Sequence, residues 1–268
     1  MRFEKWHGIG NAYLVIEQAD LPFEATVPRV RRICHPDLGA GSDGILLIGD
    51  ALDGGHPVRI FNPDGGEAEF SGNGTRIAAG YLMERESTGS VTMLTAKGAI
   101  RGERHGDVIT IDAGRASLES ATDHVPGDGL PPAERYTFVS VGNPHCVIEV
   151  DDPDRLDLAV VGAPIEHHPW FPNRANVEFY RPVAVHELRM RVWERGAGET
   201  LSSGSGSSAT AVAAIVNGRA ASPVVVHLDG GDLTIEVGDD LAVRLTGPVE
   251  RIHRGSFSAE FVAGLESM

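Results

Sequence analysis

Hydrophobic and polar residues alternate over short runs along most of this chain, and glycine, asparagine and aspartate separate the runs. Apolar or alternating runs of about four to eight residues between such turns are typical of β-strands and hairpins. We therefore predict strands in a series of segments: GILLIGD (44–50), HPVRIFN (56–62), VTMLTAKGAIRGERHGDVITIDAG (91–114), YTFVSVGNPHCVIEVDD (136–152), ANVEFYRPV (175–183), ELRMRVWERG (187–196) and PVVVHLDGGDLTIEVGDDLAVRLTG (223–247).

Two segments show a different pattern, because they are apolar nearly all round. These are TRIAAGYLMER (75–85) and SATAVAAIVNGR (208–219). A helix without a polar face is usually buried. The chain is therefore predicted to be α/β (α+β), with two pseudo-symmetric domains, each a mixed or antiparallel sheet wrapped round one central helix.

The two halves of the chain resemble each other around these helices. EAEFSGNG (67–74) aligns without gaps on ETLSSGSG (199–206), at an offset of 132 residues in a chain of 268. The offset is close to half the chain length, and an apolar helix follows each segment, so the match indicates an internal duplication. Two such halves would leave a cleft between them, which is a common place for a ligand.

Ser71 and Ser203 occupy equivalent positions directly before the two predicted helices. A serine there often does no more than cap the helix. A glycine-rich loop that opens into a helix also presents free N–H groups at the positive end of the helix dipole, which favours an anion. Two such loops could hold a carboxylate and place one serine on each side of a substrate.

Composition narrows the possible partners. Hydrophobic residues make up 41% of the chain, charged residues 23%, and the net charge is −15. This balance is typical of a soluble globular protein, and the negative charge argues against nucleic acid as a partner. We find no signal peptide and no membrane span. The two cysteines, Cys34 and Cys146, are too few for a disulfide framework, so we expect reduced, buried thiols and a cytoplasmic location.

Six segments, in this order, resemble the motifs of the diaminopimelate epimerase family: FEKWHGIGN (3–11), CHPDLGAGSDG (34–44), NPDGGEAEFSGNGTR (62–76), VGNPH (141–145), FPNRANVEF (171–179) and ERGAGETLSSGSG (194–206). The resemblance implies an isomerase that needs no cofactor and no metal and acts on a small amino acid. Its nominal reaction converts LL- into meso-diaminopimelate in lysine biosynthesis. A homodimer is compatible with the resemblance. The domains implied are residues 1–117, completed by 252–268, and residues 118–251.

The chain departs from the family at two decisive positions. In the family it resembles, each central loop carries a cysteine, and the two thiols exchange protons with opposite faces of the α-carbon. Here both positions are serine, Ser71 and Ser203. The pKa of a free thiol is about 8.5, whereas the pKa of an alcohol is several units higher. A shortfall of roughly five units costs about 7 kcal/mol, on the order of 10⁵-fold in rate.

Neighbouring groups could compensate for the serines. The resemblance places His145 and Glu194 beside the reacting pair, and a Ser–His unit is one way to activate a hydroxyl. Glu69 is a third candidate. A related isomerase of the phenazine-biosynthesis type works through a carboxylate, for which Glu69 or Glu194 would serve; substituting each by Gln separates that alternative.

Three hypotheses account for the serines themselves. They are introduced Cys→Ser changes, or a natural branch that still isomerises a substrate, or a protein that binds an amino acid without catalysis. The additional serines at 202, 207 and 208 favour a natural branch.

The resemblance also assigns binding roles, residue by residue. The helix-start amides implied to grip the α-carboxylate belong to Gly72, Asn73, Gly204 and Ser205. The substrate-binding asparagines implied are Asn11, Asn62, Asn143 and Asn176, and Glu194 with Arg195 would address the distal amino-acid end. Ala12 stands where the family commonly has aspartate, which could alter substrate preference.

Two other motifs carry less weight. GAGSDG (39–44) has the spacing of a dinucleotide-binding loop, but it precedes a predicted strand instead of following one. EHHPW (166–170) contains two adjacent histidines, which cannot easily share one tetrahedral metal ion, and we interpret it as a loop.

Overall fold

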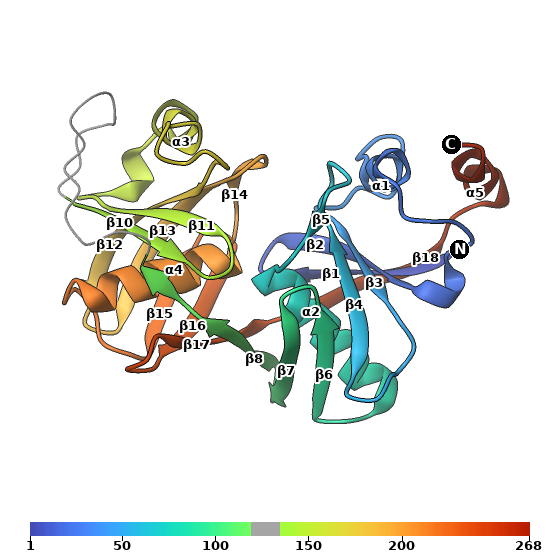
Figure 1. Cartoon of the computed structure of the whole chain (residues 1–268), viewed down its shortest axis with the longest axis horizontal. Helices are drawn as coiled ribbons and strands as arrows, with labels where there is room; N and C mark the ends of the chain where they lie inside the picture. The colour runs from blue at the N-terminus through green and yellow to red at the C-terminus, as the bar shows by residue number, and fades with distance from the viewer. Residues whose placement is uncertain (119–134) are drawn as a thin grey trace. The chain divides into compact units, whose positions relative to one another are not determined.

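The computed structural model describes residues 1–118 and 135–268, which divide into two compact units (Figure 1). Unit 1 comprises residues 1–111 and 248–268, and unit 2 comprises residues 112–247. Both limits precede those expected from the sequence, 117 and 251. The reason for the first is that β8 (Val108–Arg115) begins in unit 1, where it pairs with β7, and ends in unit 2.

The strands of unit 1 form one continuous series of pairs around α2 (Gly72–Glu86). The chain order is β1 (Arg2–Gly8), β2 (Asn11–Glu17), β3 (Ile45–Ile48), β4 (His56–Phe61), β5 (Glu67–Ala68), β6 (Ser90–Thr95), β7 (Gly98–His105), β8 and, from the C-terminal tail, β18 (Glu250–Ser256). The pairs β2–β3 and β4–β6 are parallel, whereas β18–β1, β1–β2, β3–β4, β4–β5, β6–β7 and β7–β8 are antiparallel.

Unit 2 has the same order of pairs around α4 (Gly204–Val216). Its strands are β9 (Ser117–Leu118), β10 (Arg135–Ser140), β11 (Pro144–Glu149), β12 (Asn176–Ala184), β13 (Glu187–Glu194), β14 (Gly198–Thr200), β15 (Val224–Leu228), β16 (Gly231–Val237) and β17 (Ala242–Pro248). The pairs β11–β12 and β13–β15 are parallel, and β9–β10, β10–β11, β12–β13, β13–β14, β15–β16 and β16–β17 are antiparallel.

The two series match strand for strand, from β1 with β10 to β8 with β17. The short strand and the central helix also correspond, β5 with β14 and α2 with α4. The internal duplication and the mixed-sheet fold predicted from the sequence are therefore confirmed. Gly72 and Gly204, the first residues of α2 and α4, keep the offset seen in the sequence.

Both central helices are buried, as their apolar patterns predicted. α2 packs on β1, β2, β3, β6 and β7, and α4 packs on β10, β11, β12, β13, β15 and β16. Both helices begin a few residues before the segments predicted for them, because Gly72–Gly74 and Gly204–Gly206 already form the first turns. The turns lie close to the strands, because a Cβ at Gly74 would come within 3.1 Å of Leu46 and one at Gly206 within 2.9 Å of Glu178.

Shorter elements were not predicted. They are α1 (Val27–Cys34), α3 (Leu158–Glu166), α5 (Ala259–Glu266) and the 3-10 turns η1 (Gln18–Asp20) and η2 (Pro153–Arg155). α1 links β2 to β3 and α3 links β11 to β12, so the duplication extends to them. Glu166, which we had interpreted as part of a loop, is the last residue of α3.

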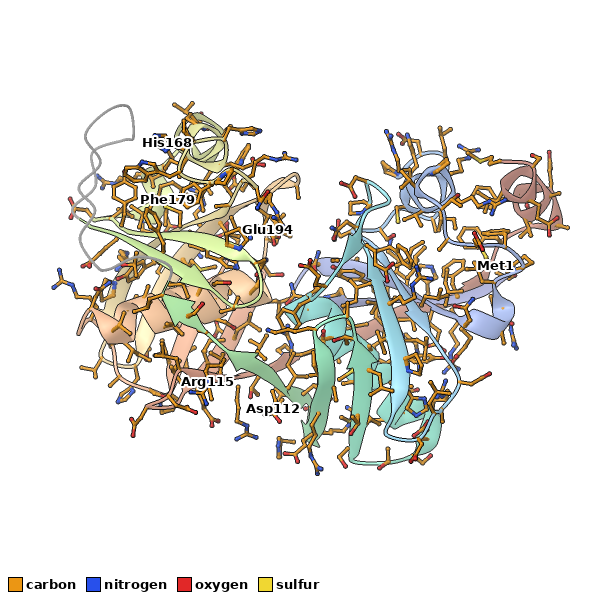
Figure 2. The ribbon with its side chains drawn as sticks, viewed as in Figure 1. Met1, Asp112, Arg115, His168, Phe179 and Glu194 are labelled. Carbon is orange, nitrogen blue, oxygen red and sulfur yellow. The ribbon has the colours of Figure 1, made fainter. Side chains whose placement is uncertain are left out.

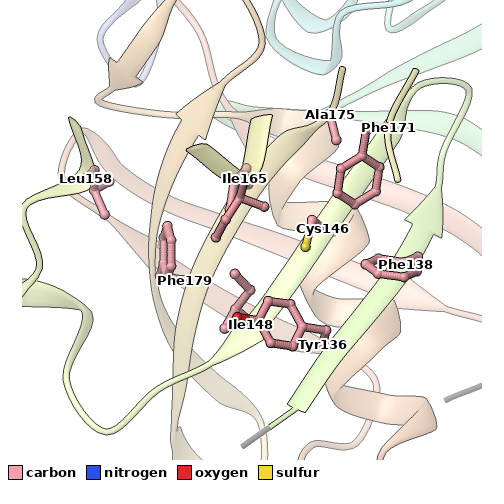
Figure 3. Packing of buried hydrophobic residues seen from close by; sticks show 10 residues of the cluster. Tyr136, Phe138, Cys146, Ile148, Leu158, Ile165, Phe171, Ala175 and Phe179 are labelled. Atoms are coloured by element: carbon pink, nitrogen blue, oxygen red, sulfur yellow. The ribbon is translucent and has the colours of Figure 1, made fainter. Parts of the chain in front are cut away.

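Each unit has a second hydrophobic cluster on the outer side of its sheet. In unit 1, α1 and α5 cover β2 and β3, and the cluster includes Ile33, Cys34 and Leu265. In unit 2, α3 packs on β12, β13 and β14, and residues of β10 and β11, including Cys146, belong to the same cluster, drawn in Figure 3. Burial raises the pKa of Cys34 to about 11 and raises that of Cys146 as well, so both thiols are inert core residues, as expected. Within residues 1–118 and 135–268, none of the helices is long and apolar enough to cross a bilayer.

Candidate active site

Ser71 caps the start of α2. Its backbone is extended (φ −139°, ψ 119°), and its Oγ accepts a hydrogen bond of 3.0 Å from the Gly74 N–H. The phenol oxygen of Tyr13, on β2, lies 3.1 Å from the same Oγ, so the two hydroxyl groups share a hydrogen bond. The serine is half-buried and thus joins a helix start to a second group that can exchange protons.

A chain of amides surrounds the first turn of α2. Asn73 donates through Nδ2 to Asn11 Oδ1 (3.2 Å), and its Oδ1 accepts from Arg76 Nη2 (2.9 Å). Arg76 is fully buried and also donates to the Gly72 carbonyl (3.3 Å). Burial lowers the pKa of Arg76 to about 9, which still leaves the guanidinium charged at neutral pH. Three expected binding residues, Asn11, Gly72 and Asn73, are thus brought together.

Ser203 caps α4 with the same backbone geometry (φ −139°, ψ 115°), and its Oγ accepts from the Gly206 N–H at 3.1 Å. Its hydroxyl donates to Glu194 Oε2 at 3.0 Å. Glu194 ends β13 (Figure 2), and its other oxygen accepts from the Thr200 hydroxyl at 2.6 Å. Of the neighbours proposed for the serines, Glu194 is the one that contacts Ser203 directly.

Glu194 is a half-buried carboxylate. Burial raises its pKa, and the charge of Glu178 adds to the rise, while the hydrogen bonds from Thr200 and Ser203 and the nearby His145 act in the opposite direction. A carboxylate with a raised pKa is a stronger base than an ordinary one and is better matched to neutral pH. Perturbed carboxyl groups of this kind cluster at functional sites.

His145 is held from both sides. Its Nδ1 lies 2.7 Å from Glu178 Oε1, and both side chains are 0% exposed. Its Nε2 lies 2.9 Å from Asn143 Oδ1. The expected residues Asn143 and His145 therefore belong to one hydrogen-bonded group, with Glu178 as a third member that the sequence analysis did not single out.

Asn176 and Arg195 meet at the turn after β13. Asn176 donates to the Pro144 carbonyl (3.2 Å) and accepts from the Arg195 N–H (2.9 Å). The buried Glu166 accepts from the Gly196 N–H at 3.0 Å and from the Trp193 indole at 2.8 Å. These bonds fix the turn that follows Glu194, so Asn176 positions the backbone there, whereas the Arg195 side chain is exposed.

Two expected residues lie apart from these groups. Asn62 follows β4 and is exposed, and its backbone closes a turn with Gly65 and Gly66. Glu69 is exposed, and the described contacts of Ser71 include Tyr13 but not Glu69. Gly204 and Ser205 form the first turn of α4 directly after Ser203 and are buried.

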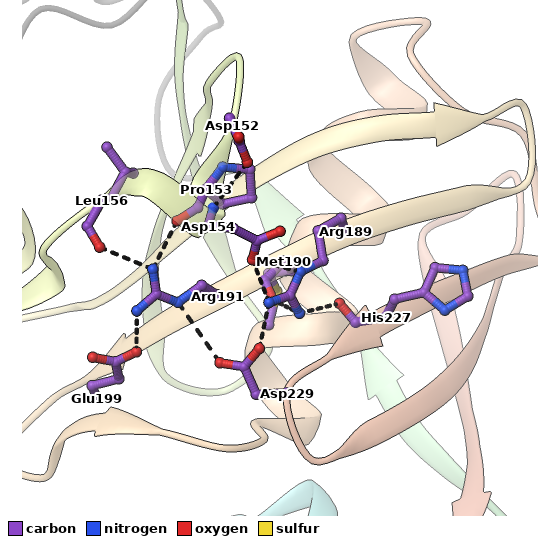
Figure 4. A network of polar contacts seen from close by, with 10 residues as sticks. All are labelled: Asp152, Pro153, Asp154, Leu156, Arg189, Met190, Arg191, Glu199, His227 and Asp229. Carbon is purple, nitrogen blue, oxygen red and sulfur yellow. Dashed lines mark hydrogen bonds and ion pairs between the residues drawn. The ribbon is translucent and has the colours of Figure 1, made fainter.

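The same ion pair supports the strand before each site. In unit 1, Arg59 on β4 donates to both oxygens of Glu67 on β5, at 2.9 and 2.7 Å. At the equivalent positions of unit 2, Arg191 on β13 binds Glu199 on β14 (Figure 4). Arg191 also donates to the carbonyls of residues 153 and 156, at 2.8 and 2.9 Å. The glutamates matched in the sequence repeat therefore brace the two hairpins.

Tyr13 and Glu178 were not predicted from the sequence, although both lie inside the quoted motifs or beside them. Tyr13 follows FEKWHGIGN by two residues, and its hydroxyl contacts Ser71 only because β2 packs against α2. Glu178 was detectable in principle, because it interrupts the apolar run between Val177 and Phe179 on β12. A carboxylate inside a buried strand rarely occurs without a partner.

Comparisons with known proteins agree with the six motifs. A family model described as Diaminopimelate epimerase matches residues 3–119 and 137–252. The diaminopimelate epimerase of Moorella thermoacetica is 41% identical over 280 residues, which cover 96% of this chain and 99% of that protein. A probable proline racemase from Agrobacterium radiobacter K84 has a similar solved structure, with a TM-score of 0.74 and 14% identity over 96% of this chain and 93% of that one. A phenazine biosynthesis protein of Bacillus anthracis matches with a TM-score of 0.71 and 14% identity, over 96% and 99% of the two chains. At such identities the two structures share the fold.

Proposed function

Because the chain belongs to the diaminopimelate epimerase family of isomerases, we propose that it inverts the α-carbon of diaminopimelate, between the LL and meso forms, in lysine biosynthesis. We propose further that Ser71 and Ser203 occupy the two positions that exchange protons with the substrate. The observation that carries this proposal is the hydrogen bond from the Ser203 hydroxyl to Glu194 at the start of α4.

Glu194 supplies the basicity that a serine lacks. As the α-proton of the substrate moves to Ser203 Oγ, the hydroxyl proton moves to Glu194 Oε2, which lies 3.0 Å away. The Cα–H and Oγ–H bonds break, new Oγ–H and Oε2–H bonds form, and the electron pair stays on the α-carbon next to the substrate carboxyl group. No free alkoxide forms, so the cost of about 7 kcal/mol for a shortfall of five pKa units is avoided.

The second proton in this mechanism comes from Ser71. Its hydroxyl proton moves to the α-carbon on the opposite face, and Tyr13 replaces it through their shared hydrogen bond of 3.1 Å. A phenol hydroxyl can donate and accept a hydrogen bond, which suits Tyr13 to this exchange with Ser71. In the reverse direction, the proton returns to Tyr13 and Glu194 gives its proton back through Ser203.

Recognition of the substrate follows from the helix starts. The first N–H groups of an α-helix have no partners within the helix and favour an anion such as a carboxylate. The amides of Gly72 and Asn73, and of Gly204 and Ser205, are suited to that role. Asn11 and Asn143 offer amides to the α-amino group, and the exposed Asn62 and Arg195 are available for the distal amino-acid end.

The test is α-proton exchange in D₂O, followed by NMR, with LL- and meso-diaminopimelate and a panel of other amino acids. We expect the serine protein to exchange diaminopimelate, and the Ser71→Cys/Ser203→Cys variant to exchange it faster. Exchange by the double variant alone would show that the serine site is disabled, and binding without exchange in either form would show a binding protein. Exchange of a different amino acid would overturn the substrate assignment.

A second candidate is an isomerase in which Glu194 removes the proton without the serine. The contact with Ser203 and the raised pKa of Glu194 favour it, whereas the Glu69 side chain is exposed. The Ser203→Ala variant separates the two mechanisms. If Ser203 relays the proton, exchange falls with Ser203→Ala and with Glu194→Gln alike; if Glu194 acts alone, only Glu194→Gln abolishes it.

A further inference from the structure

Glu178 is a buried carboxylate in the middle of β12 that none of the preceding chemistry requires. Its side chain is 0% exposed, Oε1 contacts His145 Nδ1 at 2.7 Å, and Oε2 has no hydrogen-bond partner among the residues that the structure describes. Burying a carboxylate costs free energy unless it is fully paired. A half-satisfied carboxylate in a strand core therefore indicates a role beyond packing.

The duplicated unit shows what the fold alone needs at this position. β12 pairs Glu178 with Val192, and β3 pairs Leu46 with Ile60 at the equivalent place. Glu178 packs against Gly206 in the first turn of α4, and Leu46 packs against Gly74 in the first turn of α2. A Cβ at Gly206 would lie 2.9 Å from Glu178 Oε1, and a Cβ at Gly74 would lie 3.1 Å from Leu46 Cδ2. A leucine therefore satisfies the packing, and the carboxylate in unit 2 serves something else.

The partner of Glu178 points to that role. A carboxylate oxygen can only accept, so the Nδ1 of His145 must carry a proton to bind it. The other ring nitrogen, Nε2, faces the side-chain amide of Asn143 at 2.9 Å. An asparagine amide can accept from a protonated Nε2 or, turned over, donate to a bare one. The arrangement keeps Nδ1–H directed at Glu178 and leaves Nε2 as the nitrogen that faces Asn143.

We propose that Glu178 is a positioning residue that locks His145 in the Nδ1–H form, so that Nε2 is the nitrogen presented to Asn143 and to the substrate. A carboxylate that orients an imidazole through Nδ1–H is an established device in unrelated enzymes. The inference deepens the proposed function and rests on it for its catalytic consequence. The geometry of His145 can be tested without any activity.

The first test is ¹⁵N NMR of the His145 ring in the full chain, with the His145 signals assigned by comparison with a His145→Gln variant. The native ring is expected to carry its proton on Nδ1. In Glu178→Leu, which installs the residue found in unit 1, the proton is expected to move to Nε2. In Glu178→Gln the amide oxygen can still accept, so the Nδ1–H form is expected to persist. An Nδ1–H form unchanged in Glu178→Leu would overturn the proposal.

The second test is the rate of α-proton exchange. His145 Nε2 contacts Asn143, which the proposed function assigns to the α-amino group of the substrate, and losing a contact that orients such a group typically costs about 10- to 100-fold. We expect Glu178→Leu to lower kcat/KM by that factor, and Glu178→Gln to lose less. Equal rates in all three proteins would contradict the proposal. If the native protein exchanges nothing, the proposed function fails, and the NMR result alone decides the role of Glu178.

A folding control separates both tests from simple destabilisation. Glu178→Leu removes a carboxylate whose burial costs free energy, and it introduces the side chain that packs against Gly74 at the equivalent position of unit 1. The thermal midpoint of Glu178→Leu is therefore expected to match or exceed that of the native protein. If the variant does not fold, the ring proton of His145 in Glu178→Gln decides: Nδ1–H supports the proposal and Nε2–H overturns it.

Discussion

The two helix starts share a backbone but not a chemistry. Ser71 and Ser203 have the same φ and cap their helices at 3.0 and 3.1 Å. Around them, however, Tyr13 contacts one hydroxyl and Glu194 the other. The position equivalent to Glu194 is Asn62 in unit 1, which is exposed.

Strand register extends the comparison to two further positions. Tyr13 corresponds to His145, and Leu46 corresponds to Glu178. Unit 2 therefore concentrates the carboxylates and the imidazole, whereas unit 1 has a phenol and an apolar side chain. The two units share the loop and the helix, and in the mechanism that we propose the different side chains on the surrounding strands make the site of unit 2 basic and that of unit 1 suited to donate.

The largest expected effect comes from Glu194→Gln. An amide cannot accept the proton from Ser203, so exchange should fall by about 10³-fold, within the range for loss of a general base. Glu69→Gln, the matched change in the exposed glutamate of unit 1, should have no measurable effect. The exchange assay on both variants checks this, and comparable losses in the two would contradict the asymmetry.

Two companion measurements sharpen that result. In the Ser71→Cys/Ser203→Cys background, Glu194→Gln should cost less, because a thiol ionises near pH 8.5 without a carboxylate. Since burial raises the pKa of Glu194, its charged form is less stable in the folded protein than in the unfolded chain. The free energy of unfolding therefore falls as pH rises from the ordinary glutamate pKa of 4.5 through the raised pKa of Glu194. Glu194→Gln should accordingly raise the thermal midpoint at neutral pH.

Arg76 should matter more for stability than its counterpart, Ser208. Both side chains bind the carbonyl of the first helix residue, at 3.3 Å to Gly72 and 2.8 Å to Gly204. Arg76→Met also removes the partner of Asn73 and should cost about 2–4 kcal/mol, while Ser208→Ala should cost about 1 kcal/mol. Urea unfolding measures both, and equal costs would show that the buried guanidinium has no special role.

The repeated ion pair predicts a smaller difference. Arg191→Met leaves Glu199 and two carbonyls without their partner, and its side chain is only 14% exposed, so we expect a loss of about 2 kcal/mol. Arg59→Met breaks a half-exposed pair and should cost less than about 1 kcal/mol. The free energy of unfolding checks both, and a reversed order would mean that the network in Figure 4 does not support β13.

The glycine pair gives the smallest effect on rate. A methyl group at position 206 would lie 2.9 Å from Glu178 Oε1 and force it away from His145, whereas one at position 74 would meet a movable methyl of Leu46 at 3.1 Å. Gly206→Ala should therefore slow exchange by about 10-fold, and Gly74→Ala by less. Equal rates in the two variants would indicate that Glu178 tolerates displacement.

The sequence was sufficient for the fold and for the positions of the serines, because both depend on local patterns. Turn residues, apolar helices and the repeated EAEFSGNG and ETLSSGSG segments predicted the two halves and their central helices. The helices α1, α3 and α5 were missed because each is short, with eight or nine residues, and covers only one face of a sheet.

The contacts of the site were less predictable. Tyr13 and Ser71 are 58 residues apart, and His145 and Glu178 are 33 apart, so the packing of α2 on β2 brings the first pair together and the pairing of β11 with β12 the second. A choice between His145 and Glu194 as the neighbour of Ser203 likewise depends on which strand ends beside the helix. The hairpin of β13 and β14 decides it in favour of Glu194.

The most direct test of the account is the pH dependence of α-proton exchange in the native serine protein and in Glu194→Gln. If Glu194 is the base, it must be deprotonated to act, so the native rate should fall as pH decreases through an apparent pKa above the ordinary 4.5 of a glutamate. In Glu194→Gln that step should disappear together with most of the rate. A native profile without the step, or the same step in Glu194→Gln, would contradict the account.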